Sequence, residues 1–368
     1  MRVADVANRL ERARHQAREL GADVVLVTPG PDLRYLIGYD ALPLERLTCL
    51  VLPTEGDPVL VVPRLEVLAA QASPAGSAGI ELRTWTETDD PYALVAGLVP
   101  GADRVALDNH MWAEKVLRLR EAAPSATQVL AGPILANLRM RKDESEVAAL
   151  LAAGAAIDAV HAQVPGLLRP GRTEAEVGAE IADLIIAAGH VRVDFVIVAS
   201  GPNGASPHHE VSARPLADGD AVVVDIGGTM PDGYCSDSTR TYAVGHVPDG
   251  FQESYDVLQQ AQAAAVAHAG PGVTCESVDA AARDVMAAAG LDELFIHRTG
   301  HGIGLETHEE PYIVSGNTLV LEAGMAFSIE PGFYVEGRFG ARIEDIVIAT
   351  DDGVVLANRQ SRDLVVAS

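Results

Sequence analysis

Four acidic residues in the second half of the chain occur as two matching pairs. Asp225 ends the segment GDAVVVD and Glu330 ends GMAFSIE, so that a glycine precedes each acid at the same spacing. Each acid is followed by a second one, Asp237 in GYCSDSTRT and Glu344 in ARIEDIVIA, on what the residue pattern predicts to be the return strand of a hairpin. Two equivalent halves would therefore contribute two carboxylates each.

Convergence of these carboxylates would require positive charge. The residues around them are mainly Val, Ile, Ala and Phe, and a buried carboxylate without compensation is costly or takes up a proton. Divalent metal supplies the charge most simply, and oxygen ligands with one imidazole suit Mn(II), Co(II), Fe(II) or Zn(II). Two ions about 3.5 Å apart would share bridging carboxylates and a water that ionises near neutral pH.

We expect the imidazole to be His301, within RTGHGIGLETHEEP, because the glycines on both sides allow the backbone to approach a crowded site. His308, in the same segment, is expected to face a substrate. A single strand-end Asp is commonly a cap, and a lone His is commonly a core residue. The matched set of five positions is what favours a two-metal hydrolase.

A repeated pattern predicts the elements that position these residues. Pro170–Thr173 leads through a helical run to Gly189, and Pro271–Thr274 leads likewise to Gly290. The first copy has capping-box spacing from its threonine to Glu176, and glycine is common just after a helix. We therefore expect two equivalent helices and equivalent strands that end in equivalent carboxylates, packed about a pseudo-twofold axis.

The first part of the chain, up to about Leu130, has the alternation of helices and strands that is typical of an α/β domain. Val6–Leu20 is predicted to be helical. Short apolar strands are expected at Val24–Thr28, Cys49–Leu52, Val59–Val62 and Val105–Leu107. No catalytic motif stands out in this part.

A boundary between two domains is predicted near residue 136. A long helical pattern begins near Leu138, and Asp143 and Glu144 are suited to the positive end of a helix dipole. A chain of 368 residues, 48% hydrophobic and 21% charged, has room for one large or two medium domains. We assign residues 1–135 and 136–368 to the two domains.

Composition and charge exclude several classes of partner. The 52 acidic residues outnumber the 27 basic ones, and a net charge of −25 would repel nucleic-acid phosphates and anionic lipids. The longest apolar run, Val147–Ile157, is shorter than the roughly 20 residues that span a bilayer. Three widely spaced cysteines, Cys49, Cys235 and Cys275, favour a reducing compartment. A cytoplasmic protein is expected.

At these residues the sequence resembles the pita-bread metallopeptidases, the family of prolidase, aminopeptidase P and methionine aminopeptidase, in its ordered Asp, Asp, His, Glu, Glu set. The resemblance covers residues from about 136 to 360. Asp32–Tyr39 resembles the Asn-x-x-Tyr-Leu-Thr-Gly-Phe stretch of the smaller domain in prolidase, aminopeptidase P and creatinase. It implies an α/β (α+β) fold, in which a creatinase/prolidase-type N-terminal domain precedes a pita-bread domain with a pseudo-twofold repeat.

The resemblance also implies roles for single residues. Asp225 would bind one metal, Asp237 and Glu344 would bridge both, and His301 with Glu330 would hold the other. Two divalent ions follow, with Mn favoured by family habit and Co, Zn or Fe as alternatives. Glu330 would also shuttle a proton. The substrate-contacting histidines of the family match His208 in SPHHEV, His297 and His308.

Two departures from the family pattern concern the hairpin and the substrate carboxylate. The stretch from Asp225 to Asp237 is one residue longer than in typical members, which a hairpin tip can absorb. Some prolidases place an Arg shortly after the His308 region to hold the substrate carboxylate, but here Pro311–Ile313 follows and no basic residue appears before Arg338. Arg342 would supply that charge or would support a metal ligand, and both interpretations stay open.

The resemblance predicts a metallopeptidase that hydrolyses the Xaa-Pro bond of dipeptides, so its partner is a small peptide with proline at the second position. Family members are commonly homodimers. The alternatives are aminopeptidase P acting on longer peptides, a hydrolase of a small N-acyl amino acid, a metal-free creatinase-like amidinohydrolase and a non-catalytic pita-bread binding module. The intact set of five ligands argues against the last two.

Overall fold

The computed structural model describes residues 3–368, which form two compact units that divide between Arg139 and Met140. The boundary predicted near residue 136 falls within helix α7 (Gly132–Met140). The helical pattern predicted to begin near Leu138 is divided between two helices, and Asp143 and Glu144 lie at the start of the second, as expected. The chain leaves α7 at Met140, and α8 (Glu144–His161) begins after Asp143, whose side chain forms a capping box with Glu146.

The first unit is built on one mixed six-stranded sheet. The strands are β1 (Val24–Val27), β2 (Cys49–Pro53), β3 (Val59–Pro63), β4 (Glu81–Trp85), β5 (Arg104–Leu107) and β6 (Thr127–Leu130), in the order β4-β3-β2-β1-β5-β6. The helices of this unit are α1 (Val3–Leu20), α2 (Pro31–Ile37), α3 (Val67–Ala72), α4 (Pro74–Ser77), α5 (Pro91–Leu98), α6 (Ala113–Ala122) and α7. The predicted helix and four strands are present. The two edge strands β4 and β6 were not predicted, because most of their side chains are partly or fully exposed and show no apolar run.

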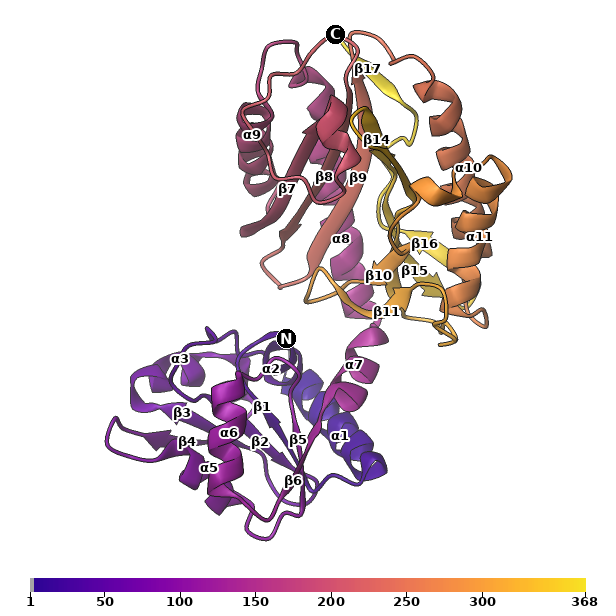
Figure 1. Cartoon of the computed structure of the whole chain (residues 1–368). Helices are drawn as coiled ribbons and strands as arrows, with labels where there is room; N and C mark the ends of the chain where they lie inside the picture. The colour runs from indigo at the N-terminus through magenta and orange to yellow at the C-terminus, as the bar shows by residue number, and fades with distance from the viewer. Residues whose placement is uncertain (1–2) are drawn as a thin grey trace. The chain divides into compact units, whose positions relative to one another are not determined.

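The second unit consists of two halves that each place a pair of helices against a sheet (Figure 1). In the first half α8 and α9 (Glu174–Ala187) pack on the sheet of β7 (Arg192–Ser200), β8 (Ala221–Thr229), β9 (Cys235–Val244) and β17 (Val365–Ala367), in the order β17-β9-β8-β7. The helices of the second half are α10 (Phe251–His268) and α11 (Cys275–Ala288).

The second half has a larger sheet and an additional hairpin. Its five strands are β10 (Gly300–Gly302), β11 (Glu309–Ile313), β12 (Ala326–Ile329), β15 (Asp345–Thr350) and β16 (Gly353–Leu356), in the order β11-β10-β12-β15-β16. The hairpin pairs β13 (Gly332–Val335) with β14 (Phe339–Arg342). Both helices α10 and α11 contribute to the core beneath these strands.

The internal repeat predicted from the sequence is present in the caps of equivalent helices. Thr173 closes a capping box with Glu176 at the start of α9, and Thr274 accepts a hydrogen bond from the Ser277 N–H at the start of α11. Each threonine also forms an isolated antiparallel bridge, Thr173 with Pro215 and Thr274 with Val320. Equivalent helices in the two halves therefore begin with the same threonine cap and the same bridge.

The prediction that equivalent strands end in equivalent carboxylates is wrong in detail. Asp225 lies in the middle of β8, whereas Glu330 directly follows β12. Asp237 lies on β9, the return strand of a hairpin, as expected. Glu344 does not, because the β13/β14 hairpin is inserted between β12 and the strand that pairs with it, β15. The insertion leaves Glu344 just before β15.

Helix α8 is the apolar helix of the first half. The stretch Glu144–Gly166 has the length and composition of a membrane-crossing helix. Its residues Ile157 and Val160 are nevertheless fully buried against the β8 and β9 side of the core, and Leu150 packs in a neighbouring cluster. Packing within the unit therefore accounts for its apolar face.

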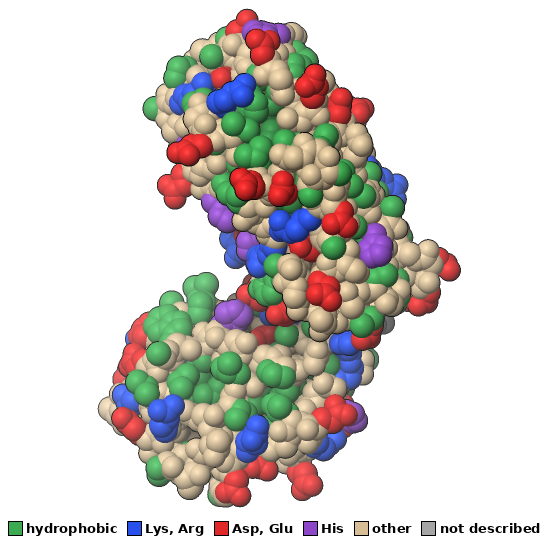
Figure 2. Space-filling view, turned by 45° about the vertical axis from the view of Figure 1, so that its right-hand side comes forward, with side chains coloured by type: hydrophobic (Ala, Val, Ile, Leu, Met, Phe, Trp, Pro, Cys, Tyr) green, Lys and Arg blue, Asp and Glu red, His purple; other side chains and the backbone are tan. Residues whose placement is uncertain are grey.

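Acidic side chains are dispersed over the surface of both units and gather in no single patch on the face of the molecule that Figure 2 shows.

At Gly154, helix α8 packs closely against the backbone of a segment near the end of the chain. A Cβ at this position would collide with the backbone carbonyl of Ala357, which cannot move aside as a side chain can. Gly154→Ala is therefore expected to lower the free energy of unfolding by about 1–3 kcal/mol, because overpacking outweighs the better helix propensity of alanine. Gly97→Ala, in helix α5 where a Cβ meets nothing within 4 Å, is the matched control and should be neutral or stabilising. Urea unfolding followed by circular dichroism measures both, and a Gly154→Ala protein as stable as the wild type would contradict the packing described.

Candidate metal centre

The five side chains predicted as metal ligands line one cavity of the second unit, with a volume of about 850 Å³. Their potential ligand atoms form overlapping groups within 4.8 Å of one another. Asp225, Asp237 and Glu344 make one group, His301, Glu330 and Glu344 make a second, and Asp237, His301 and His308 make a third. Because Glu344 belongs to the first two, the five predicted ligands have the arrangement of two adjoining cation sites.

Strand register places the two aspartates of the first half on the same face. Asp225 on β8 is directly opposite Thr239 on β9, and Asp237 lies two residues before Thr239 on that strand. Side chains two residues apart on a strand share a face, so both carboxylates project into the cavity. The last pair of this hairpin is Thr229 with Cys235. The additional residue noted in the sequence therefore lies in the hairpin tip and does not shift the register.

The glycines on both sides of His301 allow a close backbone approach, as expected, but the close neighbours are other strands. A Cβ on Gly300 would collide with the backbone of Ser328 on β12, and one on Gly302 with the backbone of Glu310 on β11. Glycine is thus required because β10 is squeezed between two neighbouring strands. The sequence prediction that glycine allows close backbone approach holds, but the backbone approaches other strands and not the acids.

The ring of His301 is oriented by its own strand. Its Nδ1 lies 3.1 Å from the Gly302 carbonyl, to which it donates, so Nε2 is the ring nitrogen that faces the acids. This Nε2 is 3.2 Å from Glu330 Oε1, 3.7 Å from Asp237 Oδ2 and 4.0 Å from Glu344 Oε1. Neutral imidazole with one nitrogen fixed by a backbone carbonyl is the form that binds a metal.

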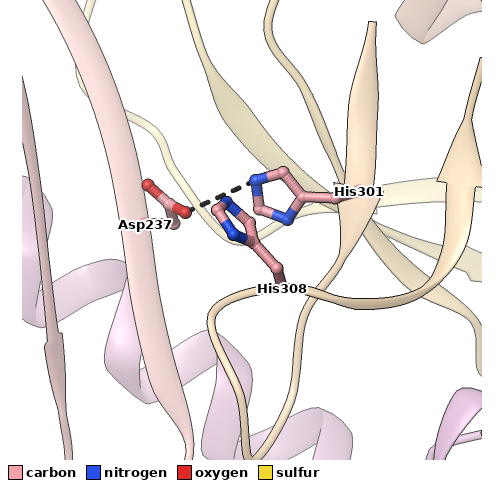
Figure 3. Close-up of side chains that lie close together, drawn as sticks. All are labelled: Asp237, His301 and His308. Carbon is pink, nitrogen blue, oxygen red and sulfur yellow. Dashed lines mark ion pairs between the residues drawn. The ribbon is translucent and has the colours of Figure 1, made fainter. Parts of the chain in front are cut away.

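His308 reaches the same place from the loop after β10. Figure 3 shows Asp237 and His301 pointing toward one another from different strands, with His308 beside them. The two histidine rings are 4.0 Å apart between centroids and nearly perpendicular. Burial, followed by the nearby charge of His301, lowers the pKa of His308 to about 4. His308 is therefore neutral at physiological pH and can offer one donor and one acceptor.

The carboxylates repel one another strongly in this buried site. Burial raises the pKa of Asp237 and of Glu344 well above the ordinary range, and the neighbouring carboxylates raise it further. Asp225 Oδ1 is buried and has no hydrogen-bond partner among the described residues. Burial also acts to raise the pKa of Glu330, but its contact with His301 and the positive charge of Arg342 outweigh burial and lower the pKa to about 2. The cluster fits divalent cations, which would satisfy the orphaned oxygen and neutralise the repulsion.

Arg342 is a cation beside these acids, and its N–H groups are engaged by the protein. Its Nη2 is 2.5 Å from Asp225 Oδ2, Nη1 donates to the Tyr334 hydroxyl at 2.8 Å, and Nε donates to Thr239 Oγ1 at 3.2 Å. Nη1 also lies 3.4 Å from the carbonyl of Pro207. The guanidinium therefore holds Asp225 in place.

The other two predicted substrate histidines differ in their surroundings. His208 is exposed and lines the cavity with no hydrogen bond from its ring among the described residues. His297 also lines the cavity, but its Nδ1 donates to the Arg298 carbonyl at 2.7 Å and its Nε2 accepts from the Tyr334 hydroxyl at 2.8 Å. Burial lowers the pKa of His297, which keeps it neutral in this chain of hydrogen bonds.

A buried glutamate fixes the loop that carries His208. Glu174, the first residue of α9, is fully buried and accepts hydrogen bonds from Ser200, Asn203, His209 and Ser212. Burial acts to raise its pKa, but these donors outweigh burial and lower the pKa to about 2. Adjacent histidines thus have opposite orientations, since His209 ties the loop to the helix and His208 faces the cavity.

The sequence did not reveal one residue that lines the cavity, Arg298, or two that support the residues lining it, Tyr334 and Thr239. Tyr334 and Thr239 carry no motif that marks them, and only their contacts with Arg342, His297 and Glu344 show their importance. Arg298 lines the cavity between two predicted residues, His297 and His301. Its basic side chain is visible in the sequence, but it lies before His301, whereas the family pattern places the basic residue after His308.

Comparison with known proteins assigns both units. Residues 9–141 match the Creatinase/Prolidase N-terminal domain, and residues 148–351 match Metallopeptidase family M24. The Xaa-Pro dipeptidase of Lactobacillus helveticus is 36% identical, covering 96% of this chain and 98% of that protein.

Two solved structures match almost the entire chain. Dipeptidase PepE from Mycobacterium ulcerans has a TM-score of 0.96 and 54% identity, covering 100% of this chain and 99% of that one. Prolidase from Thermococcus sibiricus has a TM-score of 0.92 and 35% identity, covering 98% and 99%. These likenesses confirm the expected α/β architecture of a pita-bread unit after a smaller N-terminal domain. The chain is a peptidase and belongs to Metallopeptidase family M24.

Proposed function

We propose that this protein hydrolyses the Xaa-Pro bond of dipeptides with two divalent metal ions held by the five clustered residues. The observation that carries the proposal is the pair of overlapping ligand groups joined at Glu344, together with the orphaned Oδ1 of Asp225. The similar proteins include an Xaa-Pro dipeptidase and a prolidase, and the likeness extends over nearly the full length of each.

The two cation sites divide the ligands between them. We assign Asp225 to one site and His301 with Glu330 to the other, with Asp237 and Glu344 between the two. Bound divalent ions would supply Lewis acidity for the scissile carbonyl and would lower the pKa of the attacking water. Thr239 donates to Glu344 Oε2 at 2.7 Å, which orients that carboxylate and leaves its other oxygen toward His301.

The surrounding side chains handle the proton and the substrate. Glu330 accepts from Ser328 Oγ at 3.0 Å and faces His301 Nε2, so it is placed to take a proton from water and to give it to the departing proline nitrogen. His208 and His308 project into the cavity with ring nitrogens available for the substrate carbonyl and its developing negative charge. His297 acts indirectly, because both of its ring nitrogens are engaged and it braces Tyr334.

The cavity wall suits an apolar residue after the scissile bond. Phe195, Ile197 and Ile296 line the same cavity as the ligands, and they offer apolar surface for the pyrrolidine ring of proline. The intact ligand cluster continues to argue against a metal-free amidinohydrolase and against a binding module.

Three finer assignments accompany this function. Hard oxygen ligands with one imidazole suit Mn(II), which we propose as the working ion, with Co(II), Zn(II) and Fe(II) able to substitute. A reducing cytoplasmic location is supported by three cysteines that are all free and buried. We propose a homodimer from the resemblance to the family and no nucleic-acid or membrane partner, given the acidic net charge of −25.

The substrate class is tested by comparing peptides that differ by one feature. Mn(II)-loaded protein should cleave Ala-Pro rapidly, and removal of the ions with a chelator should abolish this activity. Ala-Pro-Ala should be cleaved at least about 10-fold more slowly, since a dipeptidase relies on the terminal carboxylate. Cleavage of the tripeptide at the higher kcat/KM would instead assign aminopeptidase P activity, and no cleavage of any peptide would refute the proposal.

The assignment of Asp237 as a metal ligand predicts opposite effects on stability with and without metal. Asp237→Asn removes one of the repelling buried charges, so the metal-free variant should be more stable than metal-free wild type by about 1 kcal/mol, or roughly 2–4 °C. In excess Mn(II) the order should reverse, because the variant loses ligand binding energy. Thermal unfolding and elemental analysis measure both effects, and Asp232→Asn at the exposed hairpin tip is the control. An Asp237→Asn protein that retains two ions and full activity would disprove the assignment.

Replacement of His308 should separate substrate chemistry from metal binding. His308→Ala is expected to lower kcat by roughly 100-fold, because one hydrogen bond to the reacting carbonyl is lost. Metal content should stay at the wild-type level, since the five proposed ligands are unchanged. His268→Ala, at an exposed histidine that contacts only Ser277 among the described residues, is the control and should retain full activity. Unchanged turnover, or loss of metal in the His308 variant, would contradict the proposed role.

A further inference from the structure

We propose that Arg298 binds the C-terminal carboxylate of the substrate and thereby restricts this enzyme to dipeptides. The inference rests on the proposed Xaa-Pro hydrolysis and deepens it, since it names the residue that recognises the end of the peptide. A dipeptide has its carboxylate only one residue, about 3.8 Å, beyond the scissile carbonyl. The cation that recognises it must therefore belong to the same cavity as the metal ligands.

Arg342, the other arginine of this cavity, is not available for the substrate. Its three nitrogens contact Asp225, Tyr334 and Thr239, and the closest of these contacts is an ion pair with a carboxylate at 2.5 Å. Releasing this guanidinium to a substrate would leave Asp225 without its counter-charge.

Arg298 has the opposite surroundings. It lines the cavity and is half-buried, and among residues 3–368 no side chain makes a hydrogen bond or ion pair with its guanidinium. The cavity holds four carboxylates, yet among the described residues none of them forms an ion pair with Arg298. An incoming carboxylate is the ligand that such a group selects, because a guanidinium binds it through two parallel N–H bonds.

The guanidinium of Arg298 is held in place without using those N–H groups. Its Cζ lies 4.3 Å from the centre of the Tyr312 ring, so the planar cation stacks on an aromatic face. Stacking engages the face of the guanidinium and leaves its N–H edges free. Tyr312 on β11 is the direct strand partner of His301 on β10, which places this support one strand away from the proposed metal ligand.

The backbone of Arg298 is also fixed on both sides. Its carbonyl accepts a hydrogen bond from His297 Nδ1, and the next residue, Thr299, is fully buried and donates through its N–H and hydroxyl to Asp279 Oδ1. Such a preorganised cation loses little conformational freedom when it binds. The chain has Tyr312 and no basic residue in the segment after His308, and Arg298 supplies the positive charge from the segment before it.

The test compares two substrates that differ only in the terminal charge. Kinetics of the Mn(II)-loaded full-length protein are measured with Ala-Pro and with its amide, Ala-Pro-NH2. Arg298→Ala is expected to raise KM for Ala-Pro by roughly 10- to 100-fold, with kcat changed by only a few-fold, and to leave kcat/KM for the amide unchanged. The preference for the free carboxylate should therefore disappear. For Arg298→Lys the KM for Ala-Pro should lie between those of wild type and Arg298→Ala, because lysine keeps the positive charge but lacks the two parallel N–H donors.

A matched control is Arg338→Ala. Arg338 also stacks on an aromatic ring, with its Cζ 4.6 Å from the centre of Phe339, but it does not line the cavity. It should have wild-type kinetics with both substrates. Tyr312→Leu removes the support of Arg298 and should raise KM for Ala-Pro alone, by less than Arg298→Ala does.

The outcomes separate the two proposals. Suppose that wild type cleaves Ala-Pro, but Arg298→Ala lowers kcat/KM for both substrates equally or for neither. Arg298 then does not recognise the carboxylate, and the inference fails while the peptidase assignment stands. If metal-loaded wild type cleaves neither substrate, the proposed function fails. Should Arg298→Ala not fold, Arg298→Lys and Tyr312→Leu decide the question by the same comparison, since a structural defect would not discriminate between the acid and its amide.

Discussion

Mutual repulsion of buried carboxylates is the interaction on which the site of this protein depends. Asp225, Asp237, Glu330 and Glu344 are brought together from both halves of the second unit, and burial there raises the pKa of Asp237 and of Glu344. The fold accepts this cost because the strands that carry them are anchored by large apolar clusters on either side. Divalent cations at this cluster, as proposed above, would offset that cost, because they would neutralise the repulsion between the acids.

The asymmetry between the two halves supplies the cation that the protein itself contributes. Only the second half inserts the β13/β14 hairpin between its two paired strands, and this hairpin carries both Tyr334 and Arg342. Arg342 reaches across to Asp225 of the first half, and Tyr334 links Arg342 to His297. The inserted hairpin therefore interrupts the repeat and provides the side chains that connect the two halves.

Two arginines of one cavity acquire different functions from their neighbours alone. Arg342 is surrounded by acceptors of the protein, whereas Arg298 rests on a ring that takes none of its N–H groups. The same division separates the adjacent histidines 208 and 209, because the buried carboxylate of Glu174 claims only the second. In each case the side chain that we propose for substrate binding is the one whose hydrogen-bonding groups the described residues leave unpaired.

Sequence alone predicted the five candidate metal ligands, which line one cavity of the folded chain, and most of the elements that carry them. Matched spacing of Gly219 to Asp225 and of Gly324 to Glu330 disclosed the repeat, and local caps such as Thr173 with Glu176 need only neighbouring residues to form. The edge strands β4 and β6, the hairpin insertion before Glu344 and the mid-strand place of Asp225 escaped prediction, since they depend on pairing with distant segments. Tertiary structure decided which of Arg298 and Arg342 has free N–H groups, because hydrogen bonds to Asp225 and Thr239 join residues far apart in the chain, and no local pattern encodes which donors remain unpaired.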